Sequence, residues 1–527
     1  MKPQHHTQHT IGRWMSDRAH ATPRRVAVVD RGVPTTYAEL EIRAHKLAQK
    51  FQSAGYQVGD RVATLTGNTV DHVVVFFACA KAGLVMVPLS WRLTPRELAA
   101  NIETAAPALL LAEGEHQALA DAAVQYLPSQ PARAALGEQG VELTTPPPAT
   151  VLIQDTFPLE PSTQVHDDSG LLMLFTSGTE GQPKAVVLTH SNCFWNNLAL
   201  SRTVELTGTD TVLSVLPQFH AGGWNIQPLL AWWAGATVIL ERSFDAGRAL
   251  RLIAEHGITS MMGVPSHYLA LAEHPDFQRA DLSSLRSAVV GGAPMPPALI
   301  RLWHERGVSL VQGYGLTEAG PNVLCVVPED AREKVGYAGR AYPHVDVAIA
   351  DPVTGEHLAG PGRGELLVSG PSIFAGYFRN RAATEAAFAN GWLRTGDLVE
   401  IDADGDIRIV DRIKDIFISG GENVSPAEVE HVLLSHPAVA EAAVVGIPDA
   451  RWGEVGRAFI VKRPGIVTDG VELREFCRER LAGFKVPADF EFVASLPKSG
   501  LSKISRARLR SAQNFEYDAA ATEGGQR

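Results

Sequence analysis

The chain has 527 residues, of which 45% are hydrophobic and 20% are charged, and its formal net charge is −11. This is the composition of an ordinary globular protein, and the length exceeds one hydrophobic core, so we expect about two to four domains. An acidic chain without an evident basic face argues against a nucleic-acid partner, although a local positive loop can still bind an anionic ligand.

The cysteines lie far apart and none forms a Cys-x-x-Cys pair, which argues against a metal site or a disulfide framework. We expect buried free thiols in a reducing cytoplasm. The polar, histidine-rich N-terminus predicts a disordered start rather than a signal peptide or a metal site. The longest apolar stretch, residues 73–89, is interrupted by Lys81 and is too short to span a bilayer, so no integral membrane segment is expected. The cysteines are Cys79, Cys193, Cys325 and Cys477.

Residues 11–110 have the pattern of a compact α/β unit. Thr36 followed three residues later by Glu39 is typical of a helix-capping box. Residues 113–165 are rich in Ala, Pro and Gln and predict a helix and an exposed loop. In the first unit the predicted strands are 26–29, 61–65 and 84–88, and the predicted buried helix is 71–82.

Two apolar runs within residues 171–188 enclose a loop rich in Gly, Ser and Thr, which predicts strand, loop, strand. The glycines allow close backbone approach, the hydroxyl and N–H groups can donate hydrogen bonds to a polyphosphate, and Lys184 adds a mobile positive charge. The P-loop pattern places Gly before its lysine and Ser or Thr after it, whereas Pro183 and Ala185 flank Lys184. From these residues alone, a flexible turn and a phosphate loop are both open.

The string from Thr176 to Lys184 resembles the phosphate loop of the adenylate-forming superfamily, which contains acyl- and aryl-CoA synthetases, peptide-synthetase adenylation domains and luciferases. Ala185 departs from the Gly that usually follows the lysine. The resemblance implies that this loop binds the phosphates of ATP and that Thr179 also faces Mg²⁺. The implied phosphate-binding residues are Thr176, Ser177, Gly178, Thr179, Glu180, Gly181 and Lys184.

A strand predicted at 212–216 ends in Pro217-Gln-Phe-His220. A single histidine after a strand is more often structural than catalytic. The string nevertheless resembles the superfamily motif whose histidine lies beside the acyl carboxylate and the path of the thiol. Small and apolar residues near it favour an apolar acid, fatty or aromatic. The implied acyl pocket consists of Phe219, Gly222, Trp224, Val264 and Ala319.

Residues 237–312 alternate strand and helix patterns, which predicts a parallel sheet with ligands at the carboxyl ends of its strands. One loop at such an end, Gly313 to Glu318, resembles the adenine and magnesium motif of the superfamily, so Tyr314 is implied to stack on adenine and Glu318 to hold Mg²⁺. The predicted strands are 237–240, 259–264, 287–290 and 309–312, and the predicted helices are 249–256 and 296–305. The implied nucleotide contacts in these loops are Gly292, Ala293, Gly313, Tyr314, Gly315 and Thr317.

Residues 364–368 and 376–378 predict a smaller β-rich subdomain. Asp397 lies in a Thr-Gly-Asp string that is also a superfamily motif, where the aspartate, expected in a turn, accepts the ribose hydroxyls. Asp404-Gly405 predicts a hairpin turn before a strand at 407–410.

The charged stretch 411–416 resembles the interdomain hinge of the superfamily, although Asp411 stands where Gly is common. The resemblance directs Arg412 toward ribose or phosphate and places Lys414 at the pivot. The predicted domains are 1–410 for adenylation, 411–515 for a C-terminal lid and 516–527 for a tail.

Beyond the hinge the patterns predict a small α+β domain with Ser425 capping its first helix. Lys503 is implied to be the catalytic lysine, although Ser502 precedes it where Gly is usual, and Lys498 stays open as an alternative. The predicted helices are 426–434 and 471–481, and the predicted strands are 441–445, 458–461 and 490–493. The residues implied to line a channel for CoA are Gly420, Gly421 and Trp452.

The resemblance extends from about residue 11 to residue 510. It implies an α/β protein with a large N-terminal adenylate-forming domain and a small mobile α+β C-terminal domain. The implied activity is ATP-dependent acid–thiol ligation: a carboxylic acid and ATP give acyl-AMP and pyrophosphate, and CoA then gives acyl-CoA and AMP. ATP, Mg²⁺ and CoA are the implied cofactors, and Lys503, His220 and Lys414 are the implied catalytic residues.

Three alternatives stay open at this point. The product could pass to the thiol of a separate carrier protein, or the chain could be a non-catalytic nucleotide sensor, and a luciferase-like oxygenase is less favoured. The expected partners are small molecules in the cytoplasm, while the acid itself and the number of copies, a homodimer included, stay open.

Overall fold

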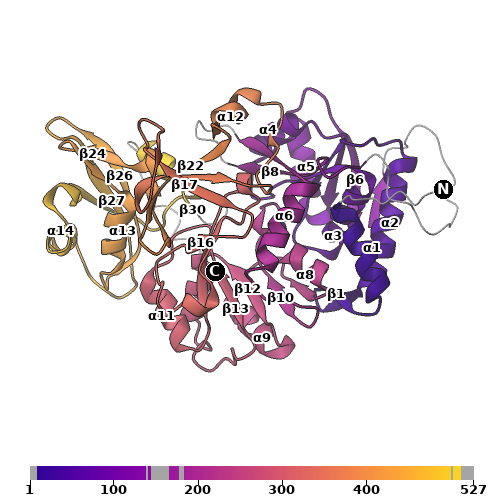
Figure 1. Ribbon diagram of the computed structural model, residues 1–527, viewed down its shortest axis with the longest axis horizontal. Coiled ribbons are helices and arrows are strands. Elements are labelled where there is room, and N and C mark those ends of the chain that lie inside the picture. Colours follow the sequence, from indigo (N-terminus) through magenta and orange to yellow (C-terminus); the bar gives the residue numbers. More distant parts are fainter. Residues whose placement is uncertain (1–8, 138–139, 144–164, 177–182, 500–502, 512–527) are drawn as a thin grey trace, which may run out of the picture. The chain divides into compact units, whose positions relative to one another are not determined.

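The computed structural model describes residues 9–137, 140–143, 165–176, 183–499 and 503–511 (Figure 1). Chain contacts divide the molecule into two compact units, residues 1–348 with 367–395 and residues 349–366 with 396–527. These units are defined by contacts within the chain, whereas the predicted boundary at residue 411 marks a hinge about which a domain turns. The boundary at residue 411 therefore stays a prediction.

A nine-stranded sheet forms one part of the first unit. The parallel strands β1, β11, β10, β12, β13 and β14 lie side by side, with antiparallel strands at both edges. Helices α9 (Ala246–His256) and α11 (Pro297–Glu305) lie beside this sheet (Figure 1). Ile253, Tyr268 and Trp303, from α9, α10 and α11, are fully buried in the core that these helices form with it. In sheet order the strands are β16 (Arg340–Ala341), β15 (Leu324–Cys325), β14 (Leu310–Tyr314), β13 (Ser287–Val290), β12 (Ser260–Gly263), β10 (Thr211–Ser214), β11 (Thr237–Leu240), β1 (Val26–Asp30) and β2 (Val33–Thr36).

An eight-stranded sheet forms the other part of the first unit. Strands β8, β4, β3, β5 and β6 are parallel, and β9 pairs antiparallel with β8. In sheet order the strands are β20 (Gly376–Tyr377), β9 (Lys184–Thr189), β8 (Gly170–Thr176), β4 (Val85–Pro88), β3 (Arg61–Leu65), β5 (Leu109–Glu113), β6 (Ala132–Gly137) and β7 (Gly140–Leu143).

Local signals account for the helix ends of this unit. Thr36, Thr94 and Thr189 each close a capping box, and Gly83 ends α3 in the left-handed conformation. Helix α3 is buried along most of its length, because it contacts β1 of one sheet, β4 of the other and helices α1 and α2. The helices are α1 (Ile11–Ala21), α2 (Tyr37–Ser53), α3 (Val70–Ala82), α4 (Pro95–Ala105), η1 (Gly114–His116), α5 (Gln117–Val124), α6 (His190–Ser201), α7 (Gly222–Asn225), α8 (Pro228–Ala234), α9 (Ala246–His256), α10 (Pro265–Glu273), α11 (Pro297–Glu305), η2 (Thr317–Ala319), η3 (Pro328–Asp330) and α12 (Arg381–Ala386).

The second unit contains the antiparallel pair of β22 and β23, and a five-stranded sheet of order β25-β24-β27-β26 with β28 beside β27. Helices α13 and α14 cover this sheet with a core that includes Val429, Leu433 and Leu473. Its strands and those leading into it are β17 (Asp346–Ala350), β18 (His357–Leu358), β19 (Gly362–Ser369), β21 (Phe388–Ala389), β22 (Trp392–Ile401), β23 (Ile407–Arg412), β24 (Phe417–Ser419), β25 (Glu422–Val424), β26 (Val439–Asp449), β27 (Gly453–Lys462), β28 (Asp489–Phe492), β29 (Lys498–Ser499) and β30 (Lys503–Ile504). Its helices are η4 (Ile413–Asp415), α13 (Pro426–Leu434), α14 (Gly470–Arg478), η5 (Gly483–Lys485) and α15 (Arg506–Ser511).

Two predictions about the fold need correction. The segment at 376–378 was expected in a small β-rich subdomain, but β20 pairs with β9 in the eight-stranded sheet. Strands β6 and β7 form where the sequence predicted an exposed loop, because β6 extends the parallel sheet beside β5. The cysteines are free and buried as expected, and within the described chain the helices are too short or too polar to cross a membrane.

Candidate active site

Strands β8 and β9 bring Thr176 and Lys184 opposite each other at the end of their ladder. Ala185, which departs from the usual Gly, is 2% exposed and packs into the core of the eight-stranded sheet. The Ala185 methyl group therefore contributes to the packing of this core. The predicted phosphate-binding residues Ser177, Gly178, Thr179, Glu180 and Gly181 lie outside the described residues.

Glu318 lies in η2, shortly after β14, and two hydroxyl groups lie beside its carboxylate. The Tyr377 hydroxyl donates to Oε1 at 2.9 Å, and the Thr176 hydroxyl lies 3.5 Å from the same oxygen. The Lys184 ammonium lies 5.0 Å from the centre of the Tyr377 ring. Four side chains from β8, β9, η2 and β20 thus meet at one place in the first unit.

Burial raises the pKa of the Tyr377 hydroxyl far above its ordinary value, and the negative charge of Glu318 raises it further. The phenol therefore stays protonated at neutral pH and donates to the carboxylate. Carboxylate and hydroxyl oxygens are ligands that Mg²⁺ accepts, so Glu318 and Thr176 fit this ion chemically. The Lys184 charge beside them suits an anionic group.

Backbone packing holds the loops that surround this cluster. A Cβ on Gly315 would lie 1.5 Å from the carbonyl oxygen of Pro321, and a Cβ on Gly291 would lie 2.8 Å from that of Gly313. The N–H of Phe374 donates to the carbonyl of Glu318 at 2.8 Å. These glycines are therefore required by the fold itself, whether or not a nucleotide lies against them.

The other nucleotide contacts implied by the sequence lie in the same part of the first unit. Tyr314 ends β14 and is half-buried, as are Gly313 and Thr317, whereas Gly292 and Ala293 are exposed after β13. Because β13 and β14 are parallel neighbours, their carboxyl ends lie on one edge of the sheet. This edge is the place where Tyr314 and Ala293 would face a common ligand.

His220 is half-buried, and its ring lies 4.7 Å from that of Phe219 in a tilted arrangement. Phe219, Val264 and Ala319 are buried apolar residues, which is the character expected of an acyl pocket. Trp224 is different, because it has no exposed surface and stacks on Phe76 with ring centres 4.6 Å apart.

The residues beside Trp224 also have structural reasons for their identity. A Cβ on Gly223 would lie 2.5 Å from the carbonyl oxygen of Pro217, and one on Gly222 would lie 2.9 Å from Leu216. The indole N–H of Trp224 donates to the carbonyl of Gln218. In this structure Gly222, Gly223 and Trp224 pack helix α7 against the chain before it.

Asp397 lies within strand β22, not in a turn as the sequence predicted, because the ladder with β23 runs from Asp397 to Ile401. Its side chain is 3% exposed and forms an ion pair with Arg412 on β23, in which the Asp397 Oδ1 lies 2.6 Å from the Arg412 Nε. The two residues that the resemblance directs to the ribose therefore lie side by side in the second unit. Lys414 is exposed in η4.

Asp411, the first residue of the stretch that resembles the interdomain hinge, is buried near the end of β23. Its Oδ2 accepts the Ser425 hydroxyl at 2.6 Å and the Ala427 N–H at 2.9 Å. Ser425 caps α13, so Asp411 satisfies a second donor at the first turn of that helix. This contact explains why an aspartate replaces the common Gly here.

We expect Asp411→Ala to lower the free energy of unfolding by about 1–2 kcal/mol, since it leaves a buried helix terminus without its acceptor. Thermal unfolding of the full chain measures the change. Glu479→Ala, at an exposed position, is the control and should change stability by less than about 0.5 kcal/mol. Equal unfolding midpoints for Asp411→Ala and Glu479→Ala would contradict the capping role.

Gly420 and Gly421 form the two-residue turn between β24 and β25, with φ angles of +62° and +88°. Two consecutive left-handed residues are typical of a type I′ hairpin turn, which accounts for both glycines without a ligand. Trp452 lies over this turn, with its carbonyl accepting the Gly420 N–H at 2.8 Å and its side chain 47% exposed. The guanidinium of Arg451 lies 4.8 Å from the centre of the Trp452 ring, so this indole is partly covered although it is the large exposed side chain of the three.

The two candidate lysines occupy a short hairpin formed by β29 and β30. Lys503 pairs with Ser499, and Ser502 lies outside the described residues. The Lys498 ammonium lies 2.9 Å from the carboxylate of Glu441. Lys498 is thus engaged in an ion pair within its own unit, and the assignment of the catalytic lysine to Lys503 stays a prediction.

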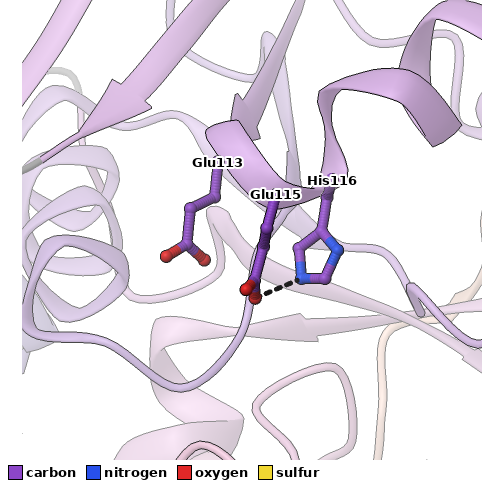
Figure 2. Close-up of side chains that lie close together, drawn as sticks. All are labelled: Glu113, Glu115 and His116. Carbon is purple, nitrogen blue, oxygen red and sulfur yellow. Dashed lines mark ion pairs between the residues drawn. The ribbon is translucent and has the colours of Figure 1, made fainter.

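Among the described residues, two groups of acidic or histidine side chains outside the site could hold a metal ion by geometry alone. Figure 2 shows the first, where Glu115 and His116 lie 3.2 Å apart beside Glu113. Arg242 pairs with both glutamates and donates to Glu113 at 2.7 and 3.0 Å, so its guanidinium already offsets their charge. The second group, Asp402, Asp404 and Asp406, is the turn of the β22–β23 hairpin, where Asp402 accepts two backbone N–H groups.

Tyr377 is the site residue that the sequence analysis missed. The strand pattern at 376–378 was recognised, but its partner β9 lies almost 190 residues earlier, and no local signal indicates that pairing. A useful signal would have been a tyrosine in a short strand, since a buried phenol needs an acceptor.

Comparisons with known proteins establish the family of the chain. The family profile described as AMP-binding enzyme matches residues 15–378, and that of the AMP-binding enzyme C-terminal domain matches residues 428–503. A feruloyl-CoA synthase of Amycolatopsis sp is 39% identical over 500 residues, with 95% of this chain and 98% of the relative covered. An indoleacetate–CoA ligase of Aromatoleum aromaticum is 35% identical over 508 residues, with 95% and 97% covered.

Among solved structures, ATP-bound MatB from Rhodopseudomonas palustris superimposes with a TM-score of 0.85 at 30% identity, covering 96% of this chain and 99% of that one. Enzymes of this kind use ATP, Mg²⁺ and CoA. The chain belongs to the AMP-binding enzyme family, within the acyl- and aryl-CoA synthetases of the adenylate-forming superfamily.

Proposed function

We propose that the chain joins a carboxylic acid to CoA in two steps, and that the cluster of Thr176, Lys184, Glu318 and Tyr377 handles the phosphates of ATP in the first. The observation that carries this proposal is the meeting of a carboxylate, a hydroxyl and an ammonium group at the end of β8 and β9. It is the set of groups that a magnesium-bound polyphosphate requires.

The first step brings two anions together, because the acid is ionised at neutral pH and ATP is highly charged. No general base is needed, since the carboxylate oxygen attacks the α-phosphate directly and pyrophosphate leaves. Fixed positive charge must offset the repulsion where negative charge develops. We assign Lys184 and the loop of residues 176–184 to the departing pyrophosphate, and Lys503 to the carboxylate and α-phosphate.

Glu318 would hold Mg²⁺, with Thr176 and Thr179 near it, and the ion would offset the charge of the phosphates. The hydroxyl of Tyr377 orients the Glu318 carboxylate through the 2.9 Å hydrogen bond. We assign the adenine to Gly292, Ala293, Tyr314 and their neighbours at the strand ends of the first unit, and the ribose to Asp397 and Arg412 of the second unit. The geometry of Arg412 and Asp397 supports a shared role, because they already form one ion pair.

In the second step the CoA thiol attacks the acyl carbon, and AMP leaves with an oxygen that came from the acid. This step needs no cationic side chain beside pyrophosphate, but it needs a path by which the thiol reaches the acyl carbon. We assign this path to His220, Gly420, Gly421 and Trp452. We propose that residues 411–515 turn about Lys414 between the two steps, as a lid. Lys414 is exposed in η4, between the half-buried Ile413 and the buried Asp415.

We propose an apolar acid with an aromatic ring or a fatty chain as the substrate. Phe219, Val264 and Ala319 are buried and apolar, and Phe219 contacts Trp91 edge-on with ring centres 6.1 Å apart. The relatives named for feruloyl-CoA and indoleacetate act on aromatic acids by their names, so aromatic acids are the first to test.

The experiment is pyrophosphate release from ATP over a panel of aromatic and fatty acids, with and without CoA. We expect sustained release only when both an acid and CoA are present, and the best acid identifies the substrate class. A single burst without CoA-dependent turnover would instead favour a carrier-protein thiol as acceptor. No release with any acid would contradict the proposed function.

We expect Trp452→Ala to raise the KM for CoA roughly tenfold while leaving acyl-AMP formation unchanged, since one exposed aromatic contact contributes on the order of 1 kcal/mol. This variant is preferable to a bulky residue at Gly421, whose φ of +88° would strain any side chain. The KM for CoA and the rate of acyl-AMP formation are measured separately. An unchanged KM would remove Trp452 from the CoA path.

Two further properties are proposed with this function. The buried free thiols suit a reducing cytoplasm, where ATP and CoA are available, and cell fractionation would test the location. A homodimer is the simplest assembly to test, by light scattering of the purified chain.

A further inference from the structure

A buried group of ion pairs joins three segments of the second unit that are far apart in the sequence. Arg506, the first residue of α15, donates to both carboxylate oxygens of Glu430 at 2.7 Å. It also lies 3.5 Å from Asp415. Arg510 donates to the other oxygen of Asp415 at 3.0 Å. Asp415 therefore contacts two arginines that lie one helical turn apart on α15.

These pairs differ from the surface ion pairs of the same unit. The side chains of Asp415 and Glu430 are 9% and 12% exposed, whereas those of Lys498 and Glu441 are 41% and 35% exposed. Exposed pairs contribute little because water and salt screen them, while a buried pair fixes its partners because separating them leaves a charge without compensation. Burial lowers the pKa of Arg506, but the carboxylates around it raise the pKa more strongly, so the guanidinium stays charged.

The positions of the partners give the group its significance. Asp415 ends η4 and directly follows Lys414, the proposed pivot. Arg506 follows the β29–β30 hairpin and stands three residues after Lys503. The hairpin is closed on the same side by the Ser505 N–H, which donates to the carbonyl of Pro497 at 2.8 Å.

An apolar contact reinforces this attachment. Leu509 of α15 and Leu496 before β29 are buried together against Phe459 of β27. The backbone that carries Lys503 is thus anchored to the five-stranded sheet by apolar contacts and to the turn after Lys414 by charge.

We propose that Asp415 is a positioning residue for the adenylation step, holding the Lys503 segment rigidly to the turn that follows the pivot. When the chain rotates at Lys414, the Lys503 segment then moves together with Asp415. Arg506 and Arg510 of α15 hold the two segments together through their ion pairs with Asp415. Asp415 touches no substrate and acts through the two arginines. This inference rests on the proposed function, specifically on the roles of Lys503 and Lys414.

The test is Asp415→Asn in the full chain, which keeps the size of the side chain and leaves the Arg506–Glu430 pair in place. We expect acyl-AMP formation to slow about tenfold to a hundredfold, the effect of a small misplacement of a catalytic group. Thioester formation from supplied acyl-AMP and CoA should be unchanged, because Lys503 has no part in that step. Asp415→Glu retains a carboxylate for both arginines and should restore most of the adenylation rate.

Glu475→Gln is the matched control, since it removes an exposed ion pair with Arg478 on α14 of the same unit. It should leave both half-reactions unchanged. If Asp415→Asn fails to fold, Arg510→Gln removes one of the two ties at a residue that is 37% exposed, and the same selective loss is expected.

Equal loss of both half-reactions, or no loss of either, in a folded Asp415→Asn variant of an active enzyme would overturn the positioning role alone. A wild-type chain that forms no acyl-AMP with any acid would overturn the proposed function and the inference with it. The two failures are distinguished by the wild-type measurement.

Discussion

We expect Lys503→Ala to slow acyl-AMP formation by about a hundredfold to a thousandfold, while thioester formation from supplied acyl-AMP and CoA continues at the wild-type rate. The reason is that the ammonium group offsets negative charge only while the carboxylate and the α-phosphate approach each other, and a single charged or dipolar group at such a position has an effect of this size. Acid-dependent exchange of pyrophosphate into ATP measures the first step, and acyl-CoA from synthetic acyl-AMP measures the second.

Lys498→Ala is the matched control for this prediction. It lies in the same hairpin, but its ammonium is 2.9 Å from Glu441, so its loss should leave both steps close to wild type. If Lys498→Ala instead slowed acyl-AMP formation alone, while Lys503→Ala behaved like the wild type, Lys498 would be the catalytic lysine. Equal loss of both steps in Lys503→Ala would contradict a role confined to adenylation.

The second large effect is expected for Glu318→Gln, which should lower the adenylation rate by about a hundredfold or more at ordinary Mg²⁺ concentrations. The amide keeps the size of the side chain, and its oxygen can still accept from Tyr377, so the loss reflects the missing charge. Higher Mg²⁺ should recover part of the activity, because the weakened site fills at higher concentration. The measurement is the Mg²⁺ dependence of pyrophosphate exchange.

Glu329→Gln, an exposed glutamate in η3, is the control for the change in net charge and should be neutral. If Glu318→Gln reduced the rate without shifting the Mg²⁺ dependence, the carboxylate would have a structural role through Tyr377 and not a metal role. Tyr377→Phe, which removes the hydroxyl alone, would then show the same defect.

The sequence predicted most elements whose signals are local. The strands at 61–65, 237–240 and 287–290 and the helix at 426–434 have the predicted bounds, because short apolar runs and caps such as Ser425 define them. The errors concern contacts between distant segments. The pairing of β20 with β9 and the extension of the sheet by β6 depend on neighbours in space that no local pattern specifies.

The same distinction applies to the candidate site. Motif order alone indicated that Thr176, Lys184 and Glu318 belong together, and the structure brings them to one place. It could not indicate Tyr377, whose hydroxyl reaches Glu318 only because of the unpredicted β20–β9 pairing.

The departures from the family motifs are also explained only in three dimensions. Asp411 replaces a common Gly because its carboxylate caps α13, and Ala185 is tolerated because its methyl group faces the core of the sheet. Neither residue therefore argues for a non-catalytic relative of the family.

The most direct test of the central claim is the fate of the oxygen atoms of the acid. A substrate acid labelled with ¹⁸O in its carboxylate is converted with ATP and CoA, and the AMP and pyrophosphate are analysed by mass spectrometry. An acyl-AMP intermediate predicts one labelled oxygen in AMP and none in pyrophosphate, because the acid attacks the α-phosphate and the thiol then breaks the carbon–oxygen bond. Unlabelled AMP, or label in inorganic phosphate with ADP as product, would contradict adenylation.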